Sequence, residues 1–234
     1  MKLSFEELRA QIEGKVIVSA QAPDGHALRD THALTAIAKA CVDGGSPAIR
    51  CGGYGGVEDI ASISNAVAVP VFGLTKEGTE GIYITPTRES VRAVARAGAA
   101  VVCADATFRE RPDGSTVSDL IETAHEEGIL FMADCATAEQ AKSAADAGAD
   151  IVSTTLAGYT EDRPKTDGPD FELLKKTREL IGPEVFLIGE GRFSSPADAA
   201  KGLELGANAI IVGTAITDPG WITAQFQAHV SNET

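Results

Sequence analysis

The segment Ile129–Ser153, which reads ILFMADCATAEQAKSAADAGADIVS, carries the clearest signal of the fold. It opens with an apolar run, Ile129–Ala133, whose length is typical of a buried strand. Thr137 then stands three residues before Gln140, which is the capping-box arrangement at the start of a helix. A second apolar run follows at Asp150–Ser153. This order predicts a strand, a helix and a further strand parallel to the first.

The same unit recurs along the chain. Helices are predicted to end at Ala97-Gly98-Ala99, Ala147-Gly148-Ala149 and Leu205-Gly206-Ala207, where glycine suits a left-handed cap. Ser195-Pro196 opens another helix, with proline in its first turn. The apolar runs are continuous, as expected for strands covered on both faces of a parallel sheet. Eight such runs, about 21–35 residues apart, are Val16–Ala20, Pro47–Cys51, Pro70–Leu74, Ala100–Ala104, Ile129–Ala133, Asp150–Ser153, Val185–Gly189 and Ala209–Val212.

Eight strand–helix units in 234 residues predict an α/β protein built as a single (β/α)8 barrel, or TIM barrel. No linker-like segment divides the chain, so we expect residues 1–234 to form one domain. A doubly wound open sheet is the alternative, because the spacing of strands does not reveal their order in the sheet.

The chain has 34 acidic against 20 basic residues, a formal net charge of −14, and 44% of it is hydrophobic. The hydrophobic share excludes general disorder. The acidity argues against nucleic acid or an anionic membrane surface as a partner, because both require clustered basic residues. A small anionic ligand remains compatible, since it needs only one local positive site.

The sequence predicts a cytoplasmic protein. Its first residues lack the pattern of a secretory signal, and no apolar stretch approaches the roughly 20 residues that span a bilayer.

Reduced, buried thiols are expected, because the cysteines show no C-x-x-C spacing. The histidines do not directly follow the predicted strands, so we expect no metal and no other cofactor. The cysteines are Cys41, Cys51, Cys103 and Cys135.

Polar side chains follow nearly every predicted strand. In a (β/α)8 barrel these positions meet at one rim, where such barrels carry their chemistry. Arg50 with Asp134 also fits a structural ion pair, Lys76 a solvated loop charge, and Asp105 a turn. The candidate rim residues are Gln21, Arg50, Lys76, Asp105, Thr107, Asp134, Thr154, Thr155, Glu190 and Thr214.

The last two predicted strands are followed by glycine-rich turns, where barrels frequently bind phosphate. A short helix beginning near Thr214 would present backbone N–H groups to an anion, and Arg192 would add positive charge. Glycine-rich turns also serve packing, so this pattern is moderately specific by itself. The predicted phosphate-binding residues are Gly191, Arg192, Gly213 and Thr214.

In combination, these motifs resemble the N-acetylmannosamine-6-phosphate 2-epimerase family of amino-sugar and sialic-acid breakdown. The resemblance runs in order from about residue 13 to residue 220. The segments that carry it are Ser19-Ala20-Gln21, Ala48-Ile49-Arg50, 70–76 (PVFGLTK), 83–87 (YITPT), Ala104-Asp105-Ala106-Thr107, 111–114 (RPDG), Met132-Ala133-Asp134-Cys135, 153–160 (STTLAGYT), Glu190-Gly191-Arg192 and 212–217 (VGTAIT).

The resemblance implies interconversion of N-acetylmannosamine 6-phosphate and N-acetylglucosamine 6-phosphate by inversion at C2. It makes Lys76 the acid/base, with Glu190 and Asp134 as further catalytic groups. Gln21 and Arg50 would contact the sugar. The predicted substrate-binding set is Gln21, Arg50, Asp105, Thr154, Gly191, Arg192, Gly213 and Thr214.

Deprotonation at C2 requires an aldehyde at C1, so the sugar ring must open first. A lysine with the ordinary pKa of about 10.4 is neutral in roughly one molecule in 2,500 at pH 7. We therefore expect burial and Arg50 to lower the pKa of Lys76, while Glu190 and Asp134 oppose that change. The carboxylates would orient the sugar, assist ring opening or relay protons.

Three positions depart from the family pattern: Glu77 stands where a basic residue is expected, His26 lies in the first loop, and Gly189 replaces a more usual alanine. These departures concern loop detail and substrate preference. The alternative functions are a Schiff-base aldolase or synthase that uses Lys76, and a non-catalytic sugar-phosphate binder.

The family precedent suggests a homodimer. The segment Trp221–Val230 is predicted to be an amphipathic helix that closes the barrel or meets a second subunit, with closure as the default.

Overall fold

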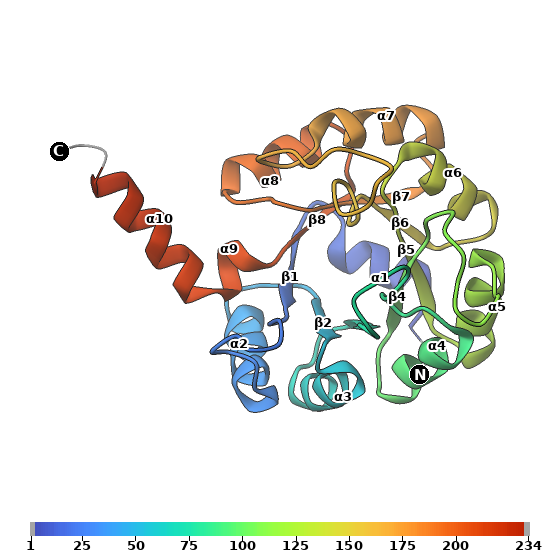
Figure 1. The fold of residues 1–234 in the computed structure, drawn as a ribbon, viewed down its shortest axis with the longest axis horizontal. Coiled ribbons are helices and arrows are strands. Elements are labelled where there is room, and N and C mark those ends of the chain that lie inside the picture. Colours follow the sequence, from blue (N-terminus) through green and yellow to red (C-terminus); the bar gives the residue numbers. More distant parts are fainter. Residues whose placement is uncertain (1–2, 232–234) are drawn as a thin grey trace.

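The computed structural model of the protein describes residues 3–231. Its strands are β1 (Val16–Ala20), β2 (Ile49–Gly53), β3 (Val71–Thr75), β4 (Val101–Asp105), β5 (Leu130–Asp134), β6 (Ile151–Ser153), β7 (Phe186–Glu190) and β8 (Ala209–Val212). They form a closed parallel barrel in sequence order (Figure 1). Closure comes from the pairing of β1 with β8, in which Val18 lies beside Val212. The predicted (β/α)8 barrel is confirmed, and the open-sheet alternative is wrong.

Several strands extend one residue further than predicted. For β3, β4, β5 and β7 the prediction ended at the last apolar or glycine residue, whereas the strand continues through the first polar one. Asp105 pairs with Asp134, and Glu190 pairs with Ile211. Polar groups at these positions are therefore fixed by strand backbone and not by mobile loops, which places them accurately at the rim.

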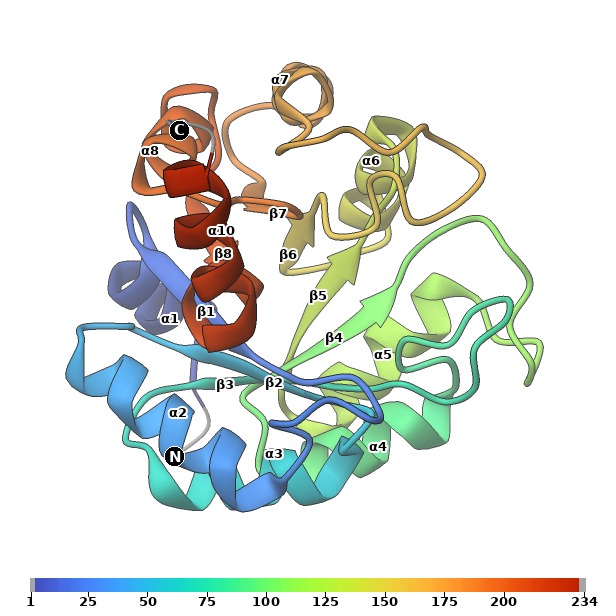
Figure 2. The ribbon, with the colours of Figure 1, turned by 60° about the vertical axis from the view of Figure 1, so that its left-hand side comes forward.

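Helices on the outside of the barrel follow the first seven strands (Figure 2). The capping box of Thr137 with Gln140 and the first-turn Pro196 after the cap Ser195 are both confirmed. Gly98, Gly148 and Gly206 have φ values of +98°, +99° and +105°, as predicted for glycine after a helix end. These helices are α2 (Thr31–Asp43), α3 (Gly56–Ala66), α4 (Arg88–Arg96), α5 (Val117–Glu127), α6 (Ala138–Asp146), α7 (Phe171–Ile181) and α8 (Pro196–Glu204).

A short N-terminal helix, α1 (Phe5–Ile12), was not predicted. Its N-cap Ser4 forms a capping box with Glu7, and this pair was the available sequence signal. Leu8 and Ile12 are fully buried, in the same apolar cluster as the residues that fill the barrel interior. The barrel interior at the α1 end is therefore packed with side chains.

The chain ends in α9 (Thr214–Thr217) and α10 (Pro219–Ser231). Helix α10 extends away from the barrel (Figure 1). Phe226 is 71% exposed and Val230 is 64% exposed. The helical prediction for Trp221–Val230 is confirmed, but its default role is wrong, because α10 does not close the barrel of its own chain.

Within residues 3–231, no helix is long and apolar enough to span a membrane. Cys51, Cys103 and Cys135 are buried and Cys41 is half-buried, and all four are free thiols, as predicted.

Candidate active site

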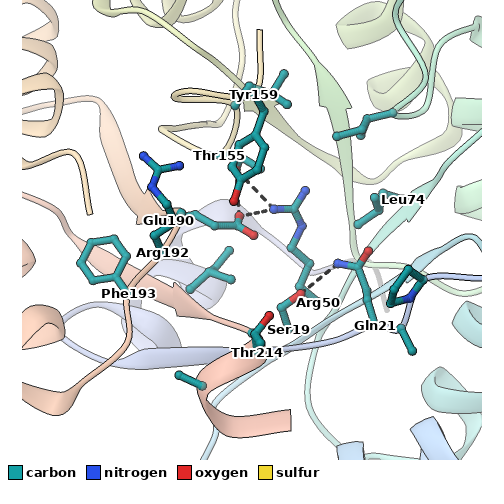
Figure 3. Close-up of a pocket in the computed structure, with 18 of the residues that line it drawn as sticks. Ser19, Gln21, Arg50, Leu74, Thr155, Tyr159, Glu190, Arg192, Phe193 and Thr214 are labelled. Atoms are coloured by element: carbon teal, nitrogen blue, oxygen red, sulfur yellow. Dashed lines mark hydrogen bonds and ion pairs between the residues drawn. The ribbon is translucent and has the colours of Figure 1, made fainter. Parts of the chain in front are cut away.

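A cavity of about 800 Å³ opens at the carboxyl ends of the strands (Figure 3). Its wall combines polar side chains at strand ends with aromatic side chains from the loops. Among the described residues its lining includes Ser19, Gln21, Arg50, Tyr54, Leu74, Lys76, Tyr83, Thr155, Tyr159, Asp167, Glu190, Gly191, Arg192, Phe193, Gly213, Thr214 and Trp221.

Arg50 lies at the floor of this cavity and is only 1% exposed. Nη2 of Arg50 donates to Oδ2 of Asp134 at 2.6 Å. Nη1 donates to Glu190 and to Thr155 Oγ1 (Figure 3). Within residues 3–231, Nε of Arg50 has no hydrogen-bond partner. The guanidinium thus joins two carboxylates from the ends of β5 and β7, which are two strands apart in the barrel. The predicted ion pair between Arg50 and Asp134 exists as part of a larger network that reaches the cavity.

Asp134 lies beneath the floor, with its side chain fully buried. Oδ1 lies 2.9 Å from Thr155 Oγ1 and accepts from Ser153 Oγ at 3.1 Å. Burial raises the pKa of Asp134 to about 6, and nearby Glu190 adds to the rise, while Arg50 acts against it. Asp134 therefore holds a proton more readily than an ordinary aspartate.

Lys76 follows β3 directly, and its backbone N–H donates to the carbonyl of Gly53 at 2.9 Å. Its ammonium group lies 5.0 Å from the centre of the Tyr54 ring, within cation–π range. Burial is the largest cause that lowers the pKa of Lys76, followed by the charge of Arg50, and Glu190 opposes both. The expected direction of the pKa shift is confirmed, with burial as its main cause.

Glu190 ends β7 and is held through both its backbone and its carboxylate. Thr154 Oγ1 donates to the carbonyl of Glu190 at 2.9 Å and accepts from its N–H at 3.1 Å. Thr155 Oγ1 donates to the carboxylate at 2.8 Å. The side chain of Glu190 remains 14% exposed, so the network positions it while leaving it open to the cavity.

Arg192 lies at the other end of the cavity from Gln21 (Figure 3). Its guanidinium donates to the carbonyls of Gly168 (3.0 Å) and Ala157 (2.8 Å) and to the hydroxyl of Thr166 (2.8 Å). Its backbone has φ +58°, in the left-handed region. Arg192 therefore fastens the loop between β6 and α7 to the cavity, in addition to contributing positive charge.

Comparison with known proteins connects this geometry to one family. The family model "Putative N-acetylmannosamine-6-phosphate epimerase" matches residues 34–232. A Corynebacterium glutamicum protein named "Putative N-acetylmannosamine-6-phosphate 2-epimerase" is 73% identical over 220 residues, which are 94% of each chain. A Cutibacterium acnes protein of the same name is 43% identical and covers 95% of this chain and 96% of its own.

A solved structure agrees. The N-acetylmannosamine-6-phosphate 2-epimerase of Clostridium perfringens superposes with a TM-score of 0.89 at 36% identity, over 94% of this chain and 95% of its own. The chain belongs to the N-acetylmannosamine-6-phosphate epimerase family. The resemblance seen in its motifs is thereby confirmed.

In this epimerase-family chain, most predicted site residues share the one cavity. Those that line it are Gln21, Arg50, Lys76, Glu190, Gly191, Arg192, Gly213 and Thr214.

Three predicted residues do not line the cavity in the described part of the chain. Asp134 lies below the floor, and Thr154 turns to the backbone of Glu190. Asp105 is 1% exposed, accepts from Arg109 at 2.6 Å and accepts from Thr107 at 2.7 Å. The hydrogen bonds of Asp105 thus agree with the reading of this residue as part of a turn.

Sequence reasoning named Thr155 as a rim residue but chose Thr154 for the site. Adjacent residues at a strand end point in opposite directions, and periodicity could not show which one faces the cavity. Tyr54, Tyr159 and Phe193 were not selected at all, because loop aromatics carry no signal before the loops are placed. Only Tyr159 had a hint, since it lies inside one of the family-like segments.

The three departures from the family pattern have separate explanations in the structure. Glu77 accepts from Thr75 Oγ1 at 2.7 Å, and His26 Nε2 lies 3.4 Å from Asp218 Oδ2. A Cβ on Gly189 would lie 2.9 Å from Cδ1 of Ile210 and 3.1 Å from Cζ of Phe193. A methyl group at position 189 would therefore crowd the ends of these two side chains, which would have to shift to accommodate it. The described residues contain no group of three or more His, Cys, Asp or Glu side chains that could hold a metal ion.

Proposed function

We propose that this protein interconverts N-acetylmannosamine 6-phosphate and N-acetylglucosamine 6-phosphate by moving a proton at C2. The observation that carries the proposal is the placement of Lys76 and Glu190. Lys76 follows β3 and Glu190 ends β7, and these strands are four positions apart in a closed barrel of eight. The two side chains therefore approach one cavity from opposite sides, as proton transfer on both faces of a planar enolate requires.

Lys76 in its neutral form is the base that takes the C2 proton from the open-chain aldehyde. Its lowered pKa increases the neutral fraction near neutral pH. Glu190 is the group on the opposite face that exchanges the second proton. Arg50 orients Glu190 and offers positive charge as the enolate forms. Arg50 lies within β2, Lys76 directly follows β3 and Glu190 ends β7, so barrel backbone places each group and little reorganisation is needed during turnover.

We propose that the two polar ends of the cavity bind different parts of the sugar phosphate. Gly191, Arg192, Gly213 and Thr214 would hold the phosphate, and Gln21 would bind a sugar hydroxyl. The amide of Gln21 already donates to Ser19 Oγ at 2.9 Å, which fixes its orientation (Figure 3). Thr154 and Asp105 would support binding indirectly, through Glu190 and the Arg109 loop.

The test is a turnover assay of the purified protein with N-acetylmannosamine 6-phosphate, together with borohydride treatment during turnover. Epimerisation without a trapped adduct is expected. A borohydride-stable adduct on Lys76 would instead indicate the Schiff-base class of enzyme. Binding without turnover would indicate a non-catalytic sugar-phosphate protein.

A homodimer is proposed from the position of α10. Helices cover the barrel after β1 to β7, whereas α10, after β8, extends outward with Phe226 and Val230 exposed (Figures 1 and 2). Packing of α10 against a second copy would remove this apolar surface from water.

The closed eight-strand sheet also supports the prediction of one domain, apart from residues 1–2 and 232–234, which lie outside the described residues. A cytoplasmic location remains part of the proposal.

A further inference from the structure

The Thr155 hydroxyl occupies a singular position between the two carboxylates of the site. Its Oγ1 lies 2.8 Å from Oε2 of Glu190 and 2.9 Å from Oδ1 of Asp134. A hydroxyl has one proton and two lone pairs, so Thr155 can donate to one carboxylate while it accepts from the other. If one carboxyl group is protonated, it can donate to the Thr155 hydroxyl while that hydroxyl donates to the other carboxylate. Both contacts are then hydrogen bonds.

Asp134 has no other route to the cavity among the described residues. Its second hydroxyl partner is Ser153, whose Oγ lies 2.7 Å from Thr155 Oγ1 and 3.3 Å from the carbonyl of Ala133. Both hydroxyl paths therefore meet at Thr155. Arg50 also joins Asp134 and Glu190, but a guanidinium keeps its protons and cannot pass one on.

We propose that Thr155 is the proton bridge between buried Asp134 and cavity-facing Glu190, with Asp134 as the proton store for Glu190. This inference rests on the proposed function, in which Glu190 exchanges a proton with the sugar. When Glu190 has given up its proton, the Asp134 carboxyl donates its proton to Thr155 Oγ1, and the Thr155 hydroxyl proton passes to Glu190 Oε2. One proton has moved, Thr155 is unchanged, and the negative charge has shifted from Glu190 to Asp134.

The environment of Asp134 fits a proton store. A fully buried carboxyl whose pKa is raised to about 6 is partly protonated close to neutral pH, and its side chain does not contact solvent directly. Charged or titratable groups face it from the surrounding elements. They are Arg50 on β2, Lys76 after β3, Cys103 and Asp105 on β4, Cys135 after β5 and Glu190 on β7.

The test compares Thr155→Val, which keeps the shape of the side chain but removes the hydroxyl, with Thr155→Ser, which keeps the hydroxyl. Ser153→Ala is the matched control, because Ser153 contacts Asp134 but not Glu190. For each protein, kcat and KM are measured from pH 5 to 9 with N-acetylmannosamine 6-phosphate. If Thr155→Val does not fold, Thr155→Ala replaces it.

For Thr155→Val we expect a fall in kcat of about 10- to 100-fold with KM changed less than about threefold. We expect the wild-type kcat profile to have an inflection near pH 6 from Asp134, and Thr155→Val should lose it. Thr155→Ser should restore both kcat and the inflection, and Ser153→Ala should retain them. Wild-type kcat in Thr155→Val, or equal damage in Thr155→Ser, would overturn the bridge. An inactive wild-type protein would instead contradict the proposed function itself.

Discussion

Nη2 of Arg50 lies 2.6 Å from Oδ2 of Asp134, and both side chains are almost completely excluded from water. A buried ion pair of this kind is costly to break, because the remaining charge has no solvent to stabilise it. The pair therefore links stability to the chemistry of the site. The same guanidinium that supports Asp134 also holds Glu190 in the cavity wall.

Arg50→Gln should lower the free energy of unfolding by about 3–5 kcal/mol at pH 8, because Asp134 and Glu190 lose their shared cation. The loss should be smaller at pH 5. The folded-state pKa of Asp134 is about 6, above the ordinary aspartate value. Protonated Asp134 therefore stabilises the folded state at low pH, and this stabilisation is lost as pH rises through about 6. Without Arg50, which lowers that pKa, the decline should extend to higher pH. Urea denaturation at both pH values measures this, and equal losses at pH 5 and pH 8 would contradict it.

Glu190→Gln should reduce kcat by about 100-fold or more, because the amide cannot exchange the proton at C2. Substrate binding should weaken by a smaller factor. The substitution should also move the acid limb of the kcat/KM profile to lower pH, because Glu190 raises the pKa of Lys76. Steady-state kinetics across pH measures both effects. An unchanged kcat would remove Glu190 from the chemistry.

Gly189→Ala should lower the free energy of unfolding by about 1 kcal/mol, since the new methyl group overlaps Cδ1 of Ile210 at 2.9 Å. Combining it with Ile210→Val removes that atom and should recover part of the loss. Thermal or urea unfolding of the single and double variants is the measurement. A double variant with simply additive losses would show that Ile210 does not enforce glycine here.

Phe226→Asp should convert the proposed dimer to a monomer, because the charge would be placed in the apolar surface of α10. Leu180→Asp is the matched control, since Leu180 is 42% exposed on α7, away from α10. Light scattering coupled to size exclusion reports the mass. A wild-type monomer, or a Phe226→Asp dimer, would contradict the assignment of this surface.

Much of the fold could be predicted because apolar runs and glycine-ended helices record the βα repeat directly. Sequence alone could not place α10, since an apolar helix looks the same whether it covers its own barrel or another. It missed α1, whose short length gives weak periodicity. In the site, Lys76 and Glu190 were found from their places at strand ends, whereas the role of Thr155 depends on a one-residue alternation that periodicity does not resolve.

NMR of N-acetylmannosamine 6-phosphate in deuterated water directly measures the proton transfer at C2 that is proposed for Lys76. Wild-type protein should produce N-acetylglucosamine 6-phosphate with deuterium at C2, and Lys76→Ala, still folded, should slow both events by at least about 1,000-fold. Deuterium incorporation by Lys76→Ala at the wild-type rate, or product without deuterium at C2, would contradict the account.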